Sequence, residues 1–457
     1  MKFIRSISLV LLCFAFVPSI VFADPLTYKV GGKTVSVVDC DVSASGELVI
    51  PPTYEGKPVT SIGNNAFKHC SSLTSVEISD SVRTIGVFAF SDCSSLMSVT
   101  IPDSVKRIGL HAFYGCGSLM SIEVGKGNTK YSSGNGVLFN RNKSMLIQFP
   151  RGKSGHYTIP ESVTSIGSSF NGCSNLTSVT IPDRVKKIEV SAFGGCSSLT
   201  SVTIGNGVTS IGVNAFEDCS SLTSVTIGNS VTIIGDYAFR SCSSLTSVTI
   251  PDNVNRIGNY AFAYSTNLTS VTIGNGVTSI GAAAFINCRS LLSVMIPERV
   301  FSIGMNAFNN CSSLKSVTIS DSIKRIGNYA FLECKSLKSI TFEGNAPTLG
   351  RNVFKMVSKD ARIFFNPDAT GFGETFGGLP VQILKKKIEI KSFGIHAAPF
   401  SLTFETESDS TYVIEASHDL QKWSDIGEVQ GTGSSVKFIQ RRKALFPKQY
   451  YRVKKAE

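Results

Sequence analysis

Histidine is scarce in this sequence, with five residues among 457, and tryptophan occurs only once. The histidines are His69, His111, His156, His396 and His418. They are scattered and have no regular spacing relative to the cysteines, so no zinc site is predicted. The Gly-x-Ser-x-Gly, His-Glu-x-x-His and P-loop motifs are also missing. We therefore predict no catalytic, cofactor-binding or metal-ligating residue, and we expect a protein that is not an enzyme.

A second long apolar run is also missing. The run from Ile7 to Phe22 is too short for a comfortable transmembrane span, and no stretch of 18 apolar residues follows it, so the mature chain is predicted to have no transmembrane segment. Lys2 and Arg5 precede this run, and Val21-Phe22-Ala23 offers a candidate cleavage site. Residues 1–23 are therefore predicted to be a signal peptide cleaved near Ala23. The mature protein is expected to be secreted or held at the cell surface.

Acidic residues are fewer than basic ones, at 33 against 44, which gives a formal net charge of +11. A positive charge favours acidic partners such as polyanionic glycans over neutral ones. Along the sequence the basic residues look scattered, apart from Lys385–Lys387 and Arg441–Lys443. The alternative explanation is that these basic residues belong to a linker and to a solvent-exposed face. Nucleic acid is not predicted as a partner, because the protein is expected to be exported.

What the sequence has in abundance is one repeated stretch. The segment CSSLMSVTIPDSVKRIGLHAF, at Cys93–Phe113, recurs along most of the chain with a period of about 23 residues. A Leu-x-x-Val-x-Ile head at this period is typical of a leucine-rich solenoid. We predict a mainly β repeat solenoid of about twelve units, whose parallel strands stack so that each repeated apolar position forms a buried ladder. The cysteine and phenylalanine ladders include Cys93, Cys116, Cys196, Cys219, Cys242, Phe90, Phe113, Phe193, Phe216 and Phe239.

Ten cysteines share one position of the repeat. Export would permit disulfides between neighbouring units. However, Ser265 and a longer unit after Cys116 divide the ladder into groups of three, four and three, so pairing of neighbours would leave single thiols over. We predict buried, reduced cysteines that act as small apolar fillers.

Glycine follows the second Ile of nearly every unit, with Glu189 as the exception. This pattern predicts a backbone angle that side chains resist. At Glu189 two explanations stay open: the conformation tolerates a side chain, or the unit is locally strained.

The changes in pattern along the chain predict its domains. Leu26–Val30 and Thr34–Val38 flank Gly31-Gly32, which indicates a hairpin in the N-terminal cap. After Ile388 the repeat gives way to alternating strand candidates around Trp423, which indicates a small β-sandwich-like module. The predicted domains are the signal peptide (1–23), the N-terminal β cap (24–58), the solenoid (59–358), its C-terminal cap (359–384), a basic linker (385–391) and the β-sandwich-like module (392–457).

One unit of the solenoid, at 117–172, is longer than the others. Cys116 and Cys173 are 57 positions apart, whereas two ordinary repeats would span 46. The segments Tyr131–Phe139 and Ser144–Pro150 indicate an inserted hairpin. Insertions in repeat proteins tend to project from one face and often bind ligands. A structural variant at a bend is the alternative.

The repeated pattern Ser-Leu-Thr-Ser-Val-Thr-Ile-Pro, followed by Val, Ile-Gly, Ala-Phe and Cys, resembles the BspA-like leucine-rich repeat family over residues 48–384. The deviant segment Tyr131–Phe139 looks like a variant of the same family. Members are typically exported or surface proteins of bacteria and some parasitic eukaryotes, and some bind host matrix proteins such as fibronectin or fibrinogen. The resemblance implies a binding role and transfers no ligand. The tail, with Tyr412–Ser417, Trp423 and Tyr450–Val453, resembles β-modules of extracellular bacterial proteins.

The candidate binding face is formed by the residues that flank the Val of each long strand, because alternation points them outwards. Rows of hydroxyls can bond to a partner's backbone or to sugars, and would suit weak, multivalent attachment. The alternative is that Ser and Thr are simply soluble strand residues. The candidate residues are Ser98, Thr100, Ser178, Thr180, Ser201, Thr203, Ser224, Thr226, Ser247, Thr249, Ser270 and Thr272.

Three functions remain possible from the sequence. The first is an adhesin-like binding protein whose solenoid surface engages an extracellular protein or an acidic glycan. The second is a structural spacer of the cell envelope or extracellular matrix. The third and most remote is an extracellular hydrolase, which would need catalytic groups in the insertion or in the C-terminal module.

Overall fold

The computed structural model describes residues 24–384, 390–394, 400–417, 421–440 and 450–456. These residues form two compact units, the first up to Phe364 together with Thr370–Val381, and the second comprising Phe365–Ala369 and the chain from Gln382. The described residues form strands and turns and no helix, so none of them lies in a helix that could cross a membrane. Several sequence-based predictions lie outside the described residues: the signal peptide, Lys385–Lys387, His396, His418 and Arg441–Lys443.

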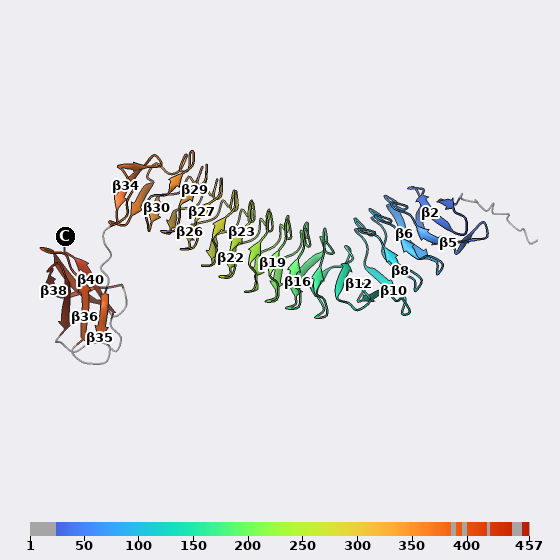
Figure 1. Ribbon diagram of the computed structural model, residues 1–457, viewed down its shortest axis with the longest axis horizontal. Helices are drawn as coiled ribbons and strands as arrows, with labels where there is room; N and C mark the ends of the chain where they lie inside the picture. The colour runs from blue at the N-terminus through green and yellow to red at the C-terminus, as the bar shows by residue number, and fades with distance from the viewer. Residues whose placement is uncertain (1–23, 385–389, 395–399, 418–420, 441–449, 457) are drawn as a thin grey trace, which may run out of the picture. The chain divides into compact units, whose positions relative to one another are not determined.

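The first unit is a parallel β-solenoid of about fourteen stacked turns (Figure 1). A typical turn carries one long strand and one two-residue short strand. The long strands are β3 (Ser45–Ile50), β6 (Ser72–Ile78), β8 (Ser98–Ile101), β10 (Ser121–Val124), β14 (Gly155–Thr158), β16 (Leu176–Ile181), β18 (Ser201–Ile204), β20 (Ser224–Thr226), β22 (Ser247–Ile250), β24 (Ser270–Ile273), β26 (Ser293–Ile296), β28 (Ser316–Ile319), β30 (Ser339–Phe342) and β32 (Arg362–Phe365). The short strands are β5 (Lys57–Ile62, longer than the others), β7 (Thr84–Ile85), β9 (Arg107–Ile108), β15 (Ser165–Ile166), β17 (Lys187–Ile188), β19 (Ser210–Ile211), β21 (Ile233–Ile234), β23 (Arg256–Ile257), β25 (Ser279–Ile280), β27 (Ser302–Ile303), β29 (Arg325–Ile326) and β31 (Thr348–Leu349).

The solenoid and its parallel strands confirm the predicted fold class. The second row of strands was not predicted, because a strand of two residues is too short to show alternation. The short strands from β15 to β31 pair in order within one sheet, whereas the long strands fall into three sheets. The long-strand sheets are β10-β8-β6-β3, β14-β16-β18-β20 and the sheet that runs from β22 to β34 and β33.

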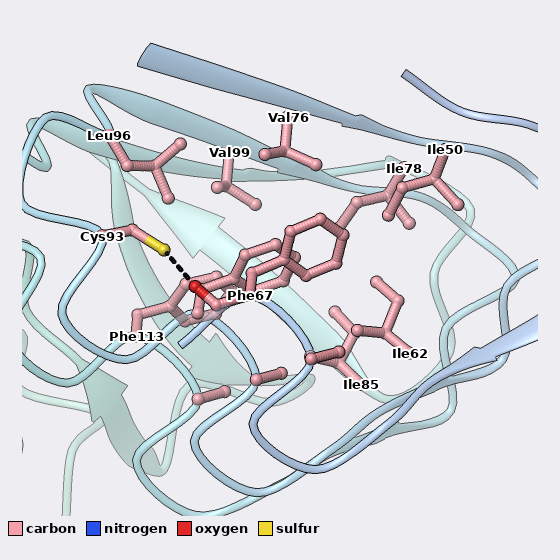
Figure 2. Packing of buried hydrophobic residues seen from close by; sticks show 14 of the residues in the cluster. Ile50, Ile62, Phe67, Val76, Ile78, Ile85, Cys93, Leu96, Val99 and Phe113 are labelled. Atoms are coloured by element: carbon pink, nitrogen blue, oxygen red, sulfur yellow. Dashed lines mark hydrogen bonds between the residues drawn. The ribbon is translucent and has the colours of Figure 1, made fainter. Parts of the chain in front are cut away.

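The core of the solenoid consists of the repeated apolar ladders. Figure 2 shows the phenylalanine side chains between the two rows of strands, with Val76 and Val99 on one side and Ile62 and Ile85 on the other. The rings of neighbouring turns stack: Phe193 lies 5.1 Å from Phe216, centroid to centroid. The ring of Phe216 lies at the same distance from that of Phe239. All five predicted phenylalanines and all five predicted cysteines are buried: Phe90, Phe113, Phe193, Phe216, Phe239, Cys93, Cys116, Cys196, Cys219 and Cys242.

The cysteines of the described residues are all buried and free. Their side chains also have a polar role that the sequence did not reveal. Cys93 donates its S–H to the backbone oxygen of Phe67, in the preceding turn, at 3.0 Å (Figure 2). Where serine replaces the cysteine, Ser265 donates to Phe239 O at 3.3 Å, so the interruption of the ladder keeps this bond. Burial raises the pKa of Cys288 to about 12, so its thiol stays protonated and able to donate at neutral pH.

The glycine that recurs after the second Ile of the units has a different cause from the predicted one. The glycines that follow the second Ile do not have the positive φ that would favour glycine. Instead they lie directly against the preceding turn: a Cβ on Gly258 would come within 2.5 Å of the backbone nitrogen of Asp236. Glu189 also has no positive φ, so this conformation tolerates a side chain. The preceding glycine of the column, Gly167, has nothing within 4 Å of an added Cβ, so the close approach is missing at the turn that directly follows the insertion.

Left-handed backbone occurs instead on both sides of nearly every ladder phenylalanine, whereas Phe170 has it on one side only, at Gly172. Around Phe216, the residues two before and two after it, Asn214 and Asp218, have φ values of 56° and 57°. Non-glycine residues adopt this conformation at a cost of about 1 kcal/mol or more each. Inter-turn hydrogen bonds offset that cost, because the backbone N–H of Asn214 bonds to Asp236 O and that of Asp218 bonds to Arg240 O.

The caps and the insertion have the predicted hairpins. In the N-terminal cap, β1 (Leu26–Val30) pairs antiparallel with β2 (Val35–Cys40), and β4 (Thr53–Tyr54) pairs with β5. In the long unit, β11 (Tyr131–Gly134) and β12 (Val137–Asn140) form an antiparallel hairpin. β13 (Met145–Gln148) then pairs antiparallel with β12 and parallel with β15, so the insertion joins the row of short strands. At the other end, β33 (Thr375–Phe376) and β34 (Leu379–Ile383) close the last long-strand sheet.

The second unit contains two three-stranded antiparallel sheets, β35-β36-β39 and β38-β37-β40. A small core of Leu402, Phe404, Tyr412 and Ile414 joins β36 of one sheet to β37 of the other, as in the predicted sandwich. The strands are β35 (Ile390–Gly394), β36 (Phe400–Glu405), β37 (Thr411–Ser417), β38 (Ser424–Gln430), β39 (Ser435–Gln440) and β40 (Tyr450–Lys455).

One carboxylate in this second unit makes its stability depend on pH. Glu415 is buried, and it accepts hydrogen bonds from Arg452 Nε at 2.6 Å and Lys454 Nζ at 3.0 Å. The bond from Arg452 is the main reason that the pKa of Glu415 falls to about 2. In the unfolded chain Glu415 has an ordinary pKa near 4.3. As the pH falls, Glu415 is therefore protonated at a higher pH in the unfolded chain than in the folded one. The stabilisation is complete above about pH 5 and is lost as the pH falls toward 2.

We therefore expect the urea midpoint of this unit to fall between pH 6 and pH 3, and the Glu415→Gln variant to lose most of that dependence. Trp423, the only tryptophan, lies under the Arg452 guanidinium at 4.2 Å, so its fluorescence reports this unit alone. Glu407→Gln is the control, because its bond to Lys455 joins two exposed side chains and such pairs contribute little. A wild-type midpoint that is equal at the two pH values would contradict the assignment.

Candidate binding surfaces of the solenoid

The candidate strand face has the predicted outward orientation. Each Val between the candidate residues points into the core, and the residues on either side are exposed or half-buried. In-register pairing aligns them in rows, as with Ser247 and Ser270, and with Thr249 and Thr272. This holds for Ser98, Thr100, Ser178, Thr180, Ser201, Thr203, Ser224, Thr226, Ser247, Thr249, Ser270 and Thr272.

Two features make this face less uniform than the sequence suggested. The long-strand pairing stops between β20 and β22, so the rows are divided at Thr226. At the insertion, His156 bonds through Nδ1 to Ser178 Oγ at 2.8 Å and through Nε2 to Thr158 Oγ1 at 2.9 Å. The face consequently offers small hydroxyls in separate segments, without the aromatic and arginine side chains that dominate tight interfaces.

A second exposed surface has those side chains. It lies where the chain turns after the short strands β7 and β9, and we call it the corner cluster: Val87, Phe88, Leu110, His111 and Tyr114. The Phe88 and His111 rings stack with centroids 5.3 Å apart, and His111 meets Tyr114 edge-on at 5.8 Å. Leu110 is 76% exposed, the most exposed large apolar side chain of the described residues.

A cation from the insertion completes this cluster. The Arg151 guanidinium lies 4.5 Å from the Tyr114 ring centroid, a favourable cation–π distance. Its orientation is fixed by a hydrogen bond from Nε to Asn171 O at 2.9 Å. The longer unit therefore brings an arginine onto an aromatic surface of an ordinary turn, which relates the insertion to a candidate site.

This surface was not predicted, because His111 was considered only as a possible zinc ligand. A signal was present in the alignment of the units on their glycines. The two positions after the glycine hold apolar or aromatic residues at Val87, Phe88 and Leu110. In other turns the same positions often hold polar residues, such as Asn64, Asn65, Asp236, Asn259, Asn306 and Asn328.

Among the described residues, no group of three His, Cys, Asp or Glu side chains has the geometry to hold a metal ion. His69 lies beside a single carboxylate, with Nδ1 3.8 Å from Asp92 Oδ2, and both side chains are well exposed. The fold thus defines the chain as a repeat solenoid protein, with the hydroxyl rows and the corner cluster exposed on its surface.

The family model for the BspA-type leucine-rich repeat region matches the chain at residues 60–154, 148–269 and 255–376. The chain belongs to this family, as the sequence resemblance predicted. No curated protein matches the chain. A crystallised leucine-rich repeat protein from Bacteroides ovatus is similar, with 27% identity and a TM-score of 0.55 over 80% of this chain and 99% of that one. A leucine-rich cell surface protein from Faecalibacterium prausnitzii has 29% identity and a TM-score of 0.47, over 71% of this chain and 94% of that one.

Proposed function

We propose that this protein is an exported, non-enzymatic, adhesin-like binding protein that engages an extracellular protein or glycan through its solenoid. The corner cluster is the observation that carries the proposal. An exposed tyrosine held by ring contacts, with an arginine over its face, has the composition of a binding hot spot, and Leu110 adds exposed apolar area to the same cluster. A pure spacer gains nothing from Leu110, which leaves most of its surface in water.

The family supports the proposed location. The predicted signal peptide also fits a secreted or surface protein. The hydroxyl rows of the strand face are the second proposed contact surface. They would add weak contacts repeated over several turns, while the corner cluster supplies the anchor.

The test is binding of the full-length protein to a panel of extracellular matrix proteins and acidic glycans. We expect saturable binding to at least one matrix protein of the panel, and at least tenfold weaker binding of that protein by the Leu110→Ala/Tyr114→Ala variant, because loss of a hot spot costs about 2 kcal/mol or more. Met305→Ala is the matched control, since Met305 occupies the repeat position of Leu110 and is also exposed. A Thr249→Lys/Thr272→Lys variant tests the strand face separately.

Two results would reject this proposal. Absence of saturable binding to every member would favour the structural spacer. Equal loss of binding in the Met305→Ala variant would show that the corner cluster is not the anchor. The remote hydrolase alternative would require turnover of a panel member that one point substitution abolishes.

A further inference from the structure

Basic residues that look scattered in the sequence are brought together by the stacking of turns around the insertion. Residues 83–187 contain twelve Lys and Arg but only five Asp and Glu. Six of the basic residues lie at one edge of the row of short strands, and we call them the basic row. They are Arg83, Lys106, Arg107, Lys130, Arg141 and Lys186, all exposed.

Backbone hydrogen bonds place the first half of this row in adjacent turns. Lys106 N donates to Arg83 O at 2.8 Å, and Arg107 pairs in register with Thr84 of the neighbouring β7. The insertion continues the row, because Lys106 Nζ donates to the hydroxyl of Thr129 at 3.1 Å. Thr129 is followed directly by Lys130, the next member of the row.

The second half follows through the hairpin. Arg141 N donates to Lys130 O at 2.9 Å, across the open end of β11 and β12. On the far side of the hairpin, Thr164 N donates to Ser144 O, and Lys186 N donates to Thr164 O. With about 4.8 Å between paired strands, the strands from β11 to β17 alone span roughly 20 Å. Such a length accommodates several monomers of a linear polymer.

These cations are not neutralised by the protein. In the described part of the chain, no carboxylate lies within 4.0 Å of any charged group of the basic row. The arginine–carboxylate pairs of the solenoid lie in later turns, Arg240 with Glu217 and Arg256 with Asp236. Unpaired like charges in adjacent turns repel one another, and a bound polyanion would relieve this repulsion.

We propose that the basic row binds a linear anionic glycan through its sulfate or carboxylate groups. The inference rests on the proposed function and names one class of partner, at a surface different from the corner cluster. A line of cations, closely spaced from Arg83 to Arg141 and ending at Lys186 two strands further on, matches a single chain that carries anionic groups along its length. Arginine and lysine in the row supply both bidentate and point-charge contacts to such groups.

The test compares two matched double variants of the full-length protein on an immobilised heparan-type sulfated oligosaccharide. Lys106→Ala/Arg107→Ala removes two charges from the row. Lys324→Ala/Arg325→Ala removes the same two residue types from the same repeat position in a later turn, where both are exposed. At about 0.15 M salt we expect about tenfold weaker binding for the first variant and a change of less than about twofold for the second. Wild-type affinity should fall steeply as salt rises, with a shallower slope for the first variant.

Equal losses of affinity in the two variants would overturn the proposal. An absence of binding between the wild-type protein and the sulfated oligosaccharide would overturn it as well. Tighter binding to duplex DNA than to the oligosaccharide would overturn the assignment to a glycan. The Leu110→Ala/Tyr114→Ala variant should keep its affinity for the oligosaccharide. Failure of the glycan inference therefore leaves the proposed protein-binding function to be judged by its own panel.

Discussion

Replacing Phe216 by alanine is expected to destabilise the solenoid by about 3–5 kcal/mol, the usual cost of deleting a buried phenylalanine. Phe216 is fully buried, and its ring is stacked between those of Phe193 and Phe239, each 5.1 Å away. Alanine would leave a cavity between two stacked rings, which the turns above and below could fill only by tilting.

The loss should be local as well as large, because each turn of a solenoid contacts only its neighbours. We expect the urea unfolding transition, monitored by circular dichroism, to occur at a lower urea concentration and to become broader. We also expect amide hydrogen exchange to accelerate most in the turns adjoining Phe216. Phe301→Ala is the matched control, since the Phe301 side chain is 55% exposed and its removal creates no cavity. Similar midpoint shifts in the two variants would show that the phenylalanine ladder is not the core.

Replacing Gly258 by alanine is expected to destabilise the same unit by about 1–3 kcal/mol, through overpacking rather than through a cavity. The added Cβ would lie within 2.5 Å of backbone atoms of Gly235 and Asp236, and a backbone atom has no rotamer by which to move away. The two turns would have to separate, which would weaken the hydrogen bond from Gly258 N to Ile234 O.

Gly167 gives this prediction a control at the same position of the repeat. An added Cβ on Gly167 meets nothing within 4 Å, and its φ is not positive. Gly167→Ala should therefore leave the thermal midpoint unchanged or raise it slightly, because alanine reduces the entropy of the unfolded chain. Equal destabilisation by the two substitutions would indicate that backbone angle, not close approach, explains the glycines.

The glycine column shows where sequence reasoning reached its limit. The sequence indicated that a side chain is disfavoured after the second Ile, but not why. A positive φ and a close contact between turns both appear in a sequence as a recurrent glycine, so the sequence does not distinguish these two causes. The structure separates them, because it places the left-handed residues beside the phenylalanine instead, at positions such as Asn214 and Tyr237.

The cysteine column shows a similar division. Its spacing predicted a buried ladder, and the interruption at Ser265 argued against pairing of neighbours. The bond from each thiol to a carbonyl of the preceding turn depends on the stacking distance, which the sequence does not state. Only with that bond does serine become a natural substitute at position 265, since a hydroxyl donates to Phe239 O as a thiol would.

By itself, the sequence determined the class of fold, the family, the repeat length and the inward-facing residues. Each of these follows from periodicity, because every turn of a solenoid buries the same residue types at the same positions of the repeat. Periodicity does not show which residues of different turns become neighbours on the surface. Only the tertiary structure decided this. Arg83, Lys106 and Lys186 are distant in sequence but lie along one edge, and Arg151 reaches Tyr114 because the insertion rejoins the stack. Surface neighbours across turns depend on stacking distance and on where the insertion fits, and these are properties of the folded chain.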